Sequence, residues 1–291
     1  MIKDNLNILV DIAIGDNCSN NIIDARKEYQ SITGNIYEDD KSYENRMALF
    51  LEWYIFDRIS SDTDQSLLDT LIQKNKENRS SNMLQTFEMF ANNIHGLFIV
   101  KKISDYYVKV LNLFDNKVYE VNESLGKLIF SKSGIFEGRL ILYDHIYHFT
   151  GSFCFHPIKA KKYIIGETKQ ISNIIQMNKK ELKNMSAQLD SQKKDLHKIS
   201  CKMDKLKTNL LKSPSENKTS AIKKKLPGLE TQRSDLEKNV LVLENELKKF
   251  TSEKTIRAPK ALQTKLIQKL SHMQLVWERS RLIDLDDIYH S

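Results

Sequence analysis

The chain has 291 residues, of which 40% are apolar and 29% charged, with only 9 Gly and 4 Pro. This composition indicates a globular, helix-rich protein with a core, and it excludes collagen-like and disordered chains. The longest N-terminal apolar run, Leu6 to Ile14, contains Asp11 and is too short to span a membrane, so we expect neither a spanning helix nor a signal peptide. The cysteines are odd in number and far apart in the sequence, at Cys18, Cys154 and Cys201. They predict neither a disulfide framework nor a structural zinc site, and they favour a cytoplasmic protein.

The charge is divided unevenly along the chain. Residues 1–156 hold 16 Lys and Arg against 22 Asp and Glu, a balance of −6, whereas residues 157–291 hold 29 against 16, a balance of +13. Such asymmetry predicts that the basic half meets a nucleic acid, an anionic membrane or an acidic protein, without distinguishing among them.

Helical patterns dominate residues 1–96. Two short helices are expected on either side of the break at Gly15, and a longer one over the run RMALFLEWYIFDR, Arg46 to Arg58. At 100° per residue this run is apolar on two opposite sides, which predicts a central, buried helix. Glu52, Asp57 and Arg58 lie inside the run, and we expect them to form structural ion pairs rather than a catalytic group. Helical periodicity returns over residues 66–72 and 84–94.

Residues 97–157 have a different pattern. Segments 97–102, 106–113, 117–121, 128–131, 139–143 and 147–155 are rich in Val, Ile, Tyr and Phe and are separated by turn residues, including Asp115 and Asn116. Short strands at this spacing predict a small antiparallel β-barrel or a strongly curved sheet.

Apolar residues recur every seven positions after residue 168. One series runs from Ile175 through Leu182 to Leu210, and a partner series is interrupted by polar Asn178 and Gln192. After the break at residues 213–217 the spacing of three and four resumes up to Phe250. This pattern predicts an antiparallel coiled-coil hairpin over residues 168–250 that fixes its register with the two polar positions and is kinked or interrupted near Pro227. The same heptads could instead pair between chains as a dimer.

A last helix is expected after Pro259, and residues 258–291 are predicted to pack back on the body. The predicted fold class is therefore α+β, in which N-terminal helices pack with a small antiparallel β-barrel or curved sheet, followed by the coiled-coil hairpin and a C-terminal helix. The predicted domains are residues 1–96, 97–157, 168–250 and 258–291.

The run around residues 46–58, followed by strands up to the Phe-His-Pro of residues 155–157, resembles an uncharacterised bacterial protein family with no known activity. The resemblance covers about residues 24–157 and implies a helical segment followed by a small β-barrel. Relative to that pattern, the hairpin looks like an insertion. The residues that carry the family core are Phe50, Trp53, Tyr54, Phe56, Asp57 and Arg58.

No motif for nucleotide binding, acyl transfer, zinc proteolysis or calcium binding occurs in the sequence. We therefore predict no cofactor and no catalytic residue. Asp144, His145, His148 and His156 form a weak cluster that could serve a metal-dependent hydrolase, but solvated or hydrogen-bonded histidines are the simpler interpretation. Cys154 lies between two Phe residues and is expected to be a packed side chain rather than a nucleophile.

The expected tip of the hairpin is strongly basic. Between residues 198 and 225 nine lysines stand against Asp204 and Glu216, a balance of +7. These lysines are Lys198, Lys202, Lys205, Lys207, Lys212, Lys218, Lys223, Lys224 and Lys225. They either bind a polyanion or only solvate the outer faces of the coil. The sequence thus favours a non-enzymatic binding or scaffolding protein that meets a protein partner, or a second copy of itself, through the coiled coil, with RNA or DNA binding at the tip as the alternative.

Overall fold

The computed structural model describes residues 2–15, 19–60, 63–77, 81–212, 216–280 and 282–290. The chain divides into two compact units. The first, the body, comprises Met1–Ser172 and Leu262–Ser291, and the second, the hairpin, comprises Asn173–Ala261. In the part of the chain that the structure describes, no helix has the length and apolar character needed to cross a membrane.

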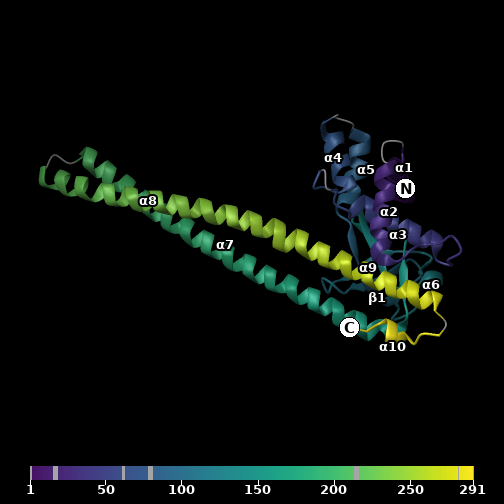
Figure 1. The fold of residues 1–291 in the computed structure, drawn as a ribbon. Helices are drawn as coiled ribbons and strands as arrows, with labels where there is room; N and C mark the ends of the chain where they lie inside the picture. The colour runs from purple at the N-terminus through teal and green to yellow at the C-terminus, as the bar shows by residue number, and fades with distance from the viewer. Residues whose placement is uncertain are drawn as a thin grey trace. The chain divides into compact units, whose positions relative to one another are not determined.

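The body begins with a helical layer. Its helices are α1 (Ile2–Ile14), α2 (Ser19–Thr33), α3 (Tyr43–Phe56), α4 (Leu67–Glu77) and α5 (Ser81–Ala91), which gather beside the sheet in Figure 1. As predicted from its two apolar sides, α3 is the central helix, because Phe50, Trp53, Ile55 and Phe56 are all buried. The rings of Phe50 and Trp53 contact Tyr29 of α2. Burial of these aromatic side chains supplies much of the apolar area that stabilises this layer.

The described strands form one mixed, curved sheet. They are β1 (Ile94–Ile103), β2 (Tyr107–Asn112), β3 (Val118–Asn122), β4 (Ile135–Tyr143), β5 (Ile146–Phe149) and β6 (Cys154–His156), in the order β1-β2-β3-β5-β4-β6. An additional antiparallel pairing of β1 with β4 closes the curve. The predicted turn at Asp115–Asn116 joins β2 to β3, and Asn116 takes the left-handed conformation there, with φ 58°. The fold class is thus confirmed, although β3 and β5 pair in parallel.

Two predicted strands differ from the structure. The predicted segment 147–155 is divided into β5 and β6 by residues 150–153, and residues 128–131 form no strand. Residues 128–131 do not extend; instead Gly126–Ile129 form the short helix α6, closed by the bond from the Phe130 N–H to the Gly126 carbonyl at 2.9 Å. In an extended strand Leu128 and Phe130 would share a face, but Leu128 is 85% exposed while Phe130 is buried. Glycine is required here because a Cβ on Gly126 would lie 2.4 Å from Cγ2 of Val108.

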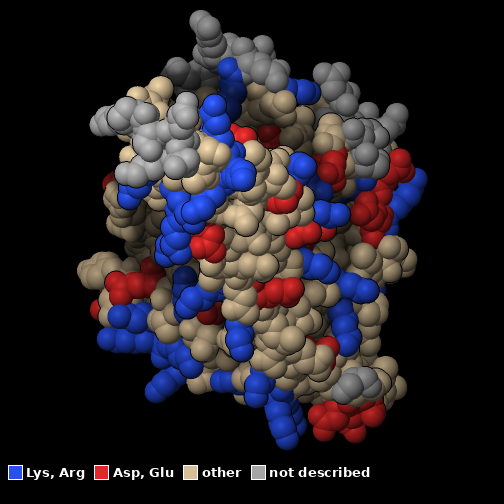
Figure 2. All heavy atoms as spheres, turned by 90° about the vertical axis from the view of Figure 1, so that its left-hand side faces the viewer, with Lys and Arg blue, Asp and Glu red and all other residues tan. Residues whose placement is uncertain are grey.

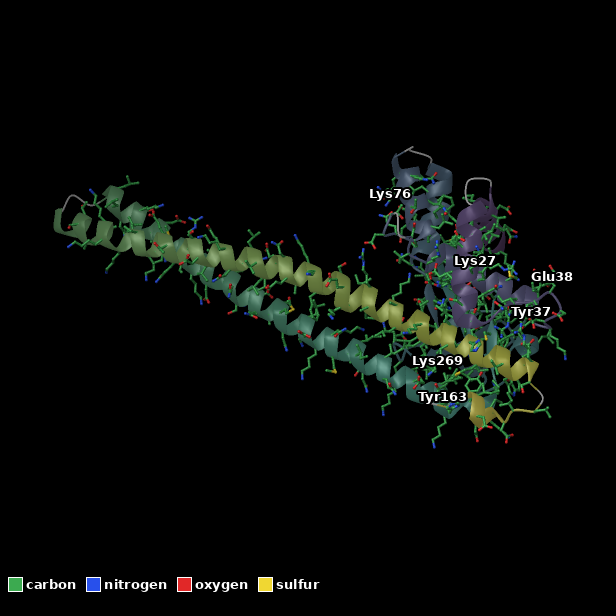
Figure 3. The ribbon with its side chains drawn as sticks, viewed as in Figure 1. Lys27, Tyr37, Glu38, Lys76, Tyr163 and Lys269 are labelled. Atoms are coloured by element: carbon green, nitrogen blue, oxygen red, sulfur yellow. The ribbon has the colours of Figure 1, made fainter. Side chains whose placement is uncertain are left out.

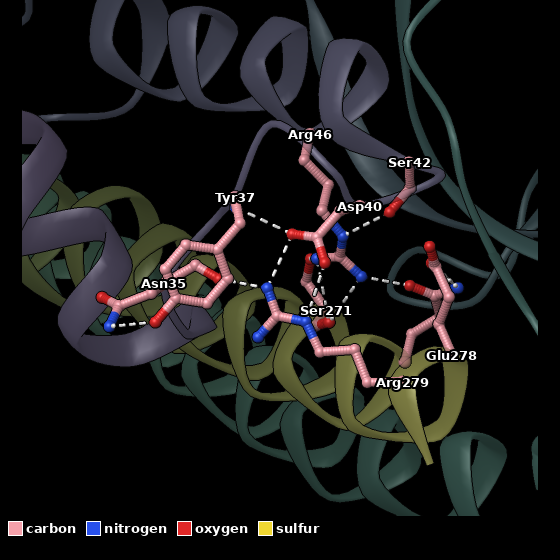
Figure 4. Close-up of polar contacts among 9 residues, drawn as sticks. Asn35, Tyr37, Asp40, Ser42, Arg46, Ser271, Glu278 and Arg279 are labelled. Atoms are coloured by element: carbon pink, nitrogen blue, oxygen red, sulfur yellow. Dashed lines mark hydrogen bonds and ion pairs between the residues drawn. The ribbon is translucent and has the colours of Figure 1, made fainter. Parts of the chain in front are cut away.

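The helix α9 (Ala258–Arg279) contacts α3 and the loop before it through two arginines, Arg279 of α9 and Arg46 of α3 (Figure 4). Arg279 binds Asp40 through both carboxylate oxygens, at 2.8 and 2.6 Å. Arg46 is buried and donates to Ser42 Oγ at 2.8 Å and to the Ser271 carbonyl at 3.3 Å. The hydrogen bond from Arg279 lowers the pKa of Asp40. These contacts fix α9 to the N-terminal helical layer within the body.

The start of the long helix α7 (Lys161–Lys212) also contacts α9 within the body. It follows the short 3₁₀ helix η1 (Ile158–Ala160). Lys269 of α9 donates to the Tyr163 hydroxyl at 2.7 Å and to Glu167 Oε2 at 3.2 Å (Figure 3). The short helix α10 (Leu285–Ile288) ends the described body and places Tyr289 against His156 of β6.

The hairpin is formed by α7 and the returning helix α8 (Glu216–Phe250), which continues through η2 (Thr251–Arg257), a π-helix. The helices run antiparallel, as the ion pairs Lys193–Glu244 and Lys207–Glu230 show. The predicted fold-back within one chain is therefore confirmed. The predicted turn residues 213–215 lie outside the described residues. Contrary to one predicted outcome, Pro227 does not interrupt α8.

Candidate functional site

The heptad residues face the inside of the hairpin. Leu189, Met203 and Val240 are buried, with 7%, 2% and 9% of their surface exposed. Asn178, one of the two predicted polar positions, donates from Nδ2 to the carbonyl of Lys254 on the opposite helix at 2.7 Å. Lys254 belongs to η2, a π-helix, whose wider turn changes which backbone carbonyls are engaged within the helix. The seam therefore stabilises the hairpin itself, and the surface available to a partner is its outer face.

Seven of the nine lysines predicted at the tip have described side chains, and these are exposed on that outer face. The side chains described as exposed are Lys198, Lys202, Lys205, Lys207, Lys223, Lys224 and Lys225. The side chains of Lys212 and Lys218 lie outside the description. Lys198 pairs with Asp195 at 2.9 Å, and Lys207 lies 3.9 Å from Glu230.

Five of the described lysines of the tip have no ion-pair partner among the described side chains. Among the described residues, Lys202, Lys205, Lys223, Lys224 and Lys225 have no carboxylate within ion-pair distance. Neighbouring like charges on a helix repel one another, so this arrangement costs some stability. A surface of this kind can bind a multiply charged anion, because the partner would supply the missing counter-charges. We refer to these five residues as the tip lysines.

A second cluster of charges is buried in the body and centres on Arg139. This side chain of β4 is 1% exposed; its Nε donates to Glu52 at 3.2 Å, and its Nη2 pairs with Asp57. Glu52 and Asp57 belong to the run that carries the family resemblance. Their contacts with Arg139 confirm the expected role in ion pairing. Arg58 pairs with Glu28 at 2.8 Å nearer the surface.

His95 completes this buried cluster. Its Nδ1 lies 3.2 Å from Asp57 and its Nε2 lies 3.1 Å from Glu137, so that the ring donates to both carboxylates when it is doubly protonated. Burial and Arg139 lower the pKa of His95, but the hydrogen bonds and charges of Asp57 and Glu137 outweigh them and raise it. Burial raises the pKa of Glu52.

The sequence did not point to Arg139, His95 or Glu137 because they lie on strands far from the motif in sequence. Cross-strand pairing of His95 with Arg139 brings them to one face of the sheet. The only available signal was the need of the α3 carboxylates for a buried cation. The cluster is held by many internal partners, so its geometry is that of a structural core element.

The candidate histidines are spread over separate positions. His145 lies at the β4–β5 turn with φ 61°, His148 lies within β5, and His156 is buried in β6. Within the described ranges no group of three His, Cys, Asp or Glu side chains is placed to hold a metal ion. The geometry therefore does not support the metal-site alternative.

Burial makes two side chains of β6, His156 and Cys154, poorly suited to acid–base or nucleophilic chemistry. Burial lowers the pKa of His156 to about 3, and its Nδ1 lies 3.2 Å from the Tyr289 hydroxyl. Burial also raises the pKa of the Cys154 thiol to about 12, which agrees with the predicted packed side chain and makes a thiolate nucleophile unfavourable.

Comparison with known proteins assigns the family. No curated protein and no solved structure matches the chain. A model for a family of unknown function, DUF7986, matches residues 2–201. The match extends beyond residues 24–157 in both directions and takes in the first part of the segment interpreted as an insertion. The chain therefore belongs to DUF7986, a family to which no function is attached.

Proposed function

We propose that this protein is a non-enzymatic binding or scaffolding protein whose hairpin presents the tip lysines to a partner with an acidic surface. The observation that carries the proposal is that five exposed lysines lack a described carboxylate partner, while the apolar seam residues of the hairpin are buried or half-buried. A helical hairpin sets the distance and orientation of its end more firmly than a loop does, which suits a scaffolding role. The widely spaced cysteines favour the cytoplasm as the compartment.

A nucleic acid is the second candidate partner. The lysines could neutralise phosphates, and the absence of aromatic residues between 198 and 225 would leave such binding without base stacking and with little sequence preference. Figure 2 shows one face of the molecule, on which basic side chains lie among acidic and uncharged groups. What distinguishes the tip is its charge density, a balance of +7 over residues 198–225. The tip is thus the stronger candidate for polyanion binding within the hairpin.

Fluorescence anisotropy with three labelled probes tests both candidates. The probes are a poly-glutamate peptide, a mixed-sequence RNA and a DNA duplex, each titrated at about 50 and about 200 mM salt. The test variant is Lys223→Glu/Lys224→Glu/Lys225→Glu. The matched control is Lys179→Glu/Lys180→Glu/Lys183→Glu, which makes the same charge change on exposed lysines of α7 distant in sequence from the tip.

We expect wild type and control to bind the poly-glutamate probe, more weakly at the higher salt, and the tip variant to lose binding while its circular dichroism stays helical. Binding of RNA or DNA alone, lost in the same variant, would replace the acidic-protein partner with a nucleic acid. Equal binding by the tip variant and wild type, or no binding of any probe by wild type at low salt, would overturn the proposal.

A further inference from the structure

A second exposed surface combines lysines with large aliphatic side chains, and it lies on the body. Ile158, Lys159, Lys161, Lys162 and Ile165 line a shallow hollow of about 420 Å³. We call these five residues the basic ridge. They belong to η1 and the first turns of α7 and are separate from the tip lysines in sequence and in structural unit.

The lysines of the ridge are placed where local electrostatics disfavour them. The first turn of α7 contains no acidic residue, although the amino end of a helix carries partial positive charge. Within the described part of the chain, Lys159, Lys161 and Lys162 have no carboxylate at ion-pair distance, and Lys161 donates only to the Ser133 carbonyl at 3.4 Å. Local rules of this kind are broken most often where a surface has a function.

The aliphatic side chains of the ridge are exposed to water. Ile158 is 61% exposed and Ile165 is 38% exposed. Removing such side chains from water is favourable in proportion to the apolar area buried, so both would be stabilised by entering an apolar medium. The long stems of the flanking lysines can lie along that medium while their ammonium groups remain at its polar edge.

We propose that the basic ridge docks the body onto an anionic lipid bilayer, with Ile158 and Ile165 entering the acyl boundary and the three lysines contacting headgroup phosphates. Charge complementarity selects this occupant: three uncompensated cations surround two exposed aliphatic groups, which is the pattern of an interfacial membrane site. A nucleic acid would satisfy the lysines but leave the isoleucines in water. Glu167 and Asp286 line the adjacent hollow together with Lys159 and Lys162, so these two carboxylates bound the ridge on that side.

Vesicle co-sedimentation of the full-length protein tests this proposal. The probes are phosphatidylcholine vesicles with and without about 30 mol% phosphatidylglycerol. We expect binding only to the anionic vesicles. Lys159→Glu/Lys161→Glu/Lys162→Glu should weaken it on the order of 100-fold, at about fivefold for each lysine removed. The change Lys223→Glu/Lys224→Glu/Lys225→Glu has the same net charge effect on the hairpin and should leave binding within about threefold of wild type.

Two further variants test the apolar contribution. Ile158→Ser should weaken anionic-vesicle binding by about tenfold without altering the melting curve, since the side chain is already largely exposed. In a Trp277→Phe background, the tryptophan fluorescence of the Ile158→Trp variant should be quenched by brominated lipid in anionic vesicles. The fluorescence of the Val242→Trp variant, whose change lies on the hairpin, should not be quenched.

Three results would overturn the proposal. These are failure of wild type to bind anionic vesicles, unchanged binding by the ridge triple variant, and unchanged binding by Ile158→Ser. If the ridge variant instead loses binding to the RNA or DNA probe while wild type ignores vesicles, the surface is a nucleic-acid site and the bilayer proposal fails. Because the tip variant is measured in parallel, failure here is distinguishable from failure of the function proposed for the hairpin.

Discussion

Replacement of the buried arginine should reveal how much the body depends on its internal charges. Arg139→Met keeps an unbranched side chain of similar length but removes the cation that contacts Glu52 and Asp57. It also removes the guanidinium that lies 4.7 Å from the ring centre of Phe56. Two carboxylates then remain buried with fewer charged partners. Breaking such a pair from one side costs about 3–5 kcal/mol, so we expect the free energy of unfolding to fall by that amount.

Urea denaturation followed by circular dichroism and tryptophan fluorescence measures this change, because Trp53 reports on the body. The control is Arg58→Met, since Arg58 and Glu28 form a partly exposed pair whose loss should cost about 0–1 kcal/mol. The double variant Glu52→Gln/Arg139→Met should recover part of the loss, since one buried charge is removed with its partner. A decrease of less than about 1 kcal/mol for Arg139→Met would refute the assignment of the cluster as a stability element.

Two further predictions concern other buried positions. Since burial lowers the pKa of His156 to about 3 from an ordinary 6.5, its contribution to stability is full above pH 6.5 and is lost as the pH falls toward 3. The unfolding free energy of wild type should fall as the pH drops below 6.5, and His156→Leu should reduce the slope of that fall by up to about 1.4 kcal/mol for each pH unit. Urea titrations from pH 7 to 4 measure the slope, and parallel curves for wild type and variant would contradict the assignment. Gly126→Ala should lower the unfolding free energy by about 1–3 kcal/mol, because the new Cβ would collide with Val108, and an unchanged melting temperature would show that the two segments separate freely.

Much of the architecture could be predicted because its periodicity was strong. Heptad spacing predicted the hairpin, and the two apolar sides of residues 46–58 predicted a central helix. The strand prediction for residues 128–131 was wrong because Leu128 and Phe130 are residue types that suit a strand. The helix found there depends instead on a local turn, in which the Phe130 N–H donates to the Gly126 carbonyl. The parallel pairing of β3 with β5 depends on contacts between distant segments, which local pattern does not encode.

The candidate sites were predictable to different degrees. Lysine density alone identified the tip. The exposure of Ile158 and Ile165 could not be read from sequence, because isoleucine near the start of a helix is usually a core residue. The partners of Arg139 were hidden for another reason: a buried ion pair joins residues that are far apart in the chain, and only cross-strand register brings them together.

The π-helical segment Thr251–Arg257 bears on how the returning helix tolerates a change in length. Each residue of an α-helix advances the side chain by about 100°, so a one-residue deletion elsewhere in the returning helix would turn every later heptad position away from its partner. Within residues 251–257, loss of one residue can be absorbed when the wide turn closes to an α-helical one. A one-residue deletion should therefore be tolerated in this stretch while the seam keeps its phase.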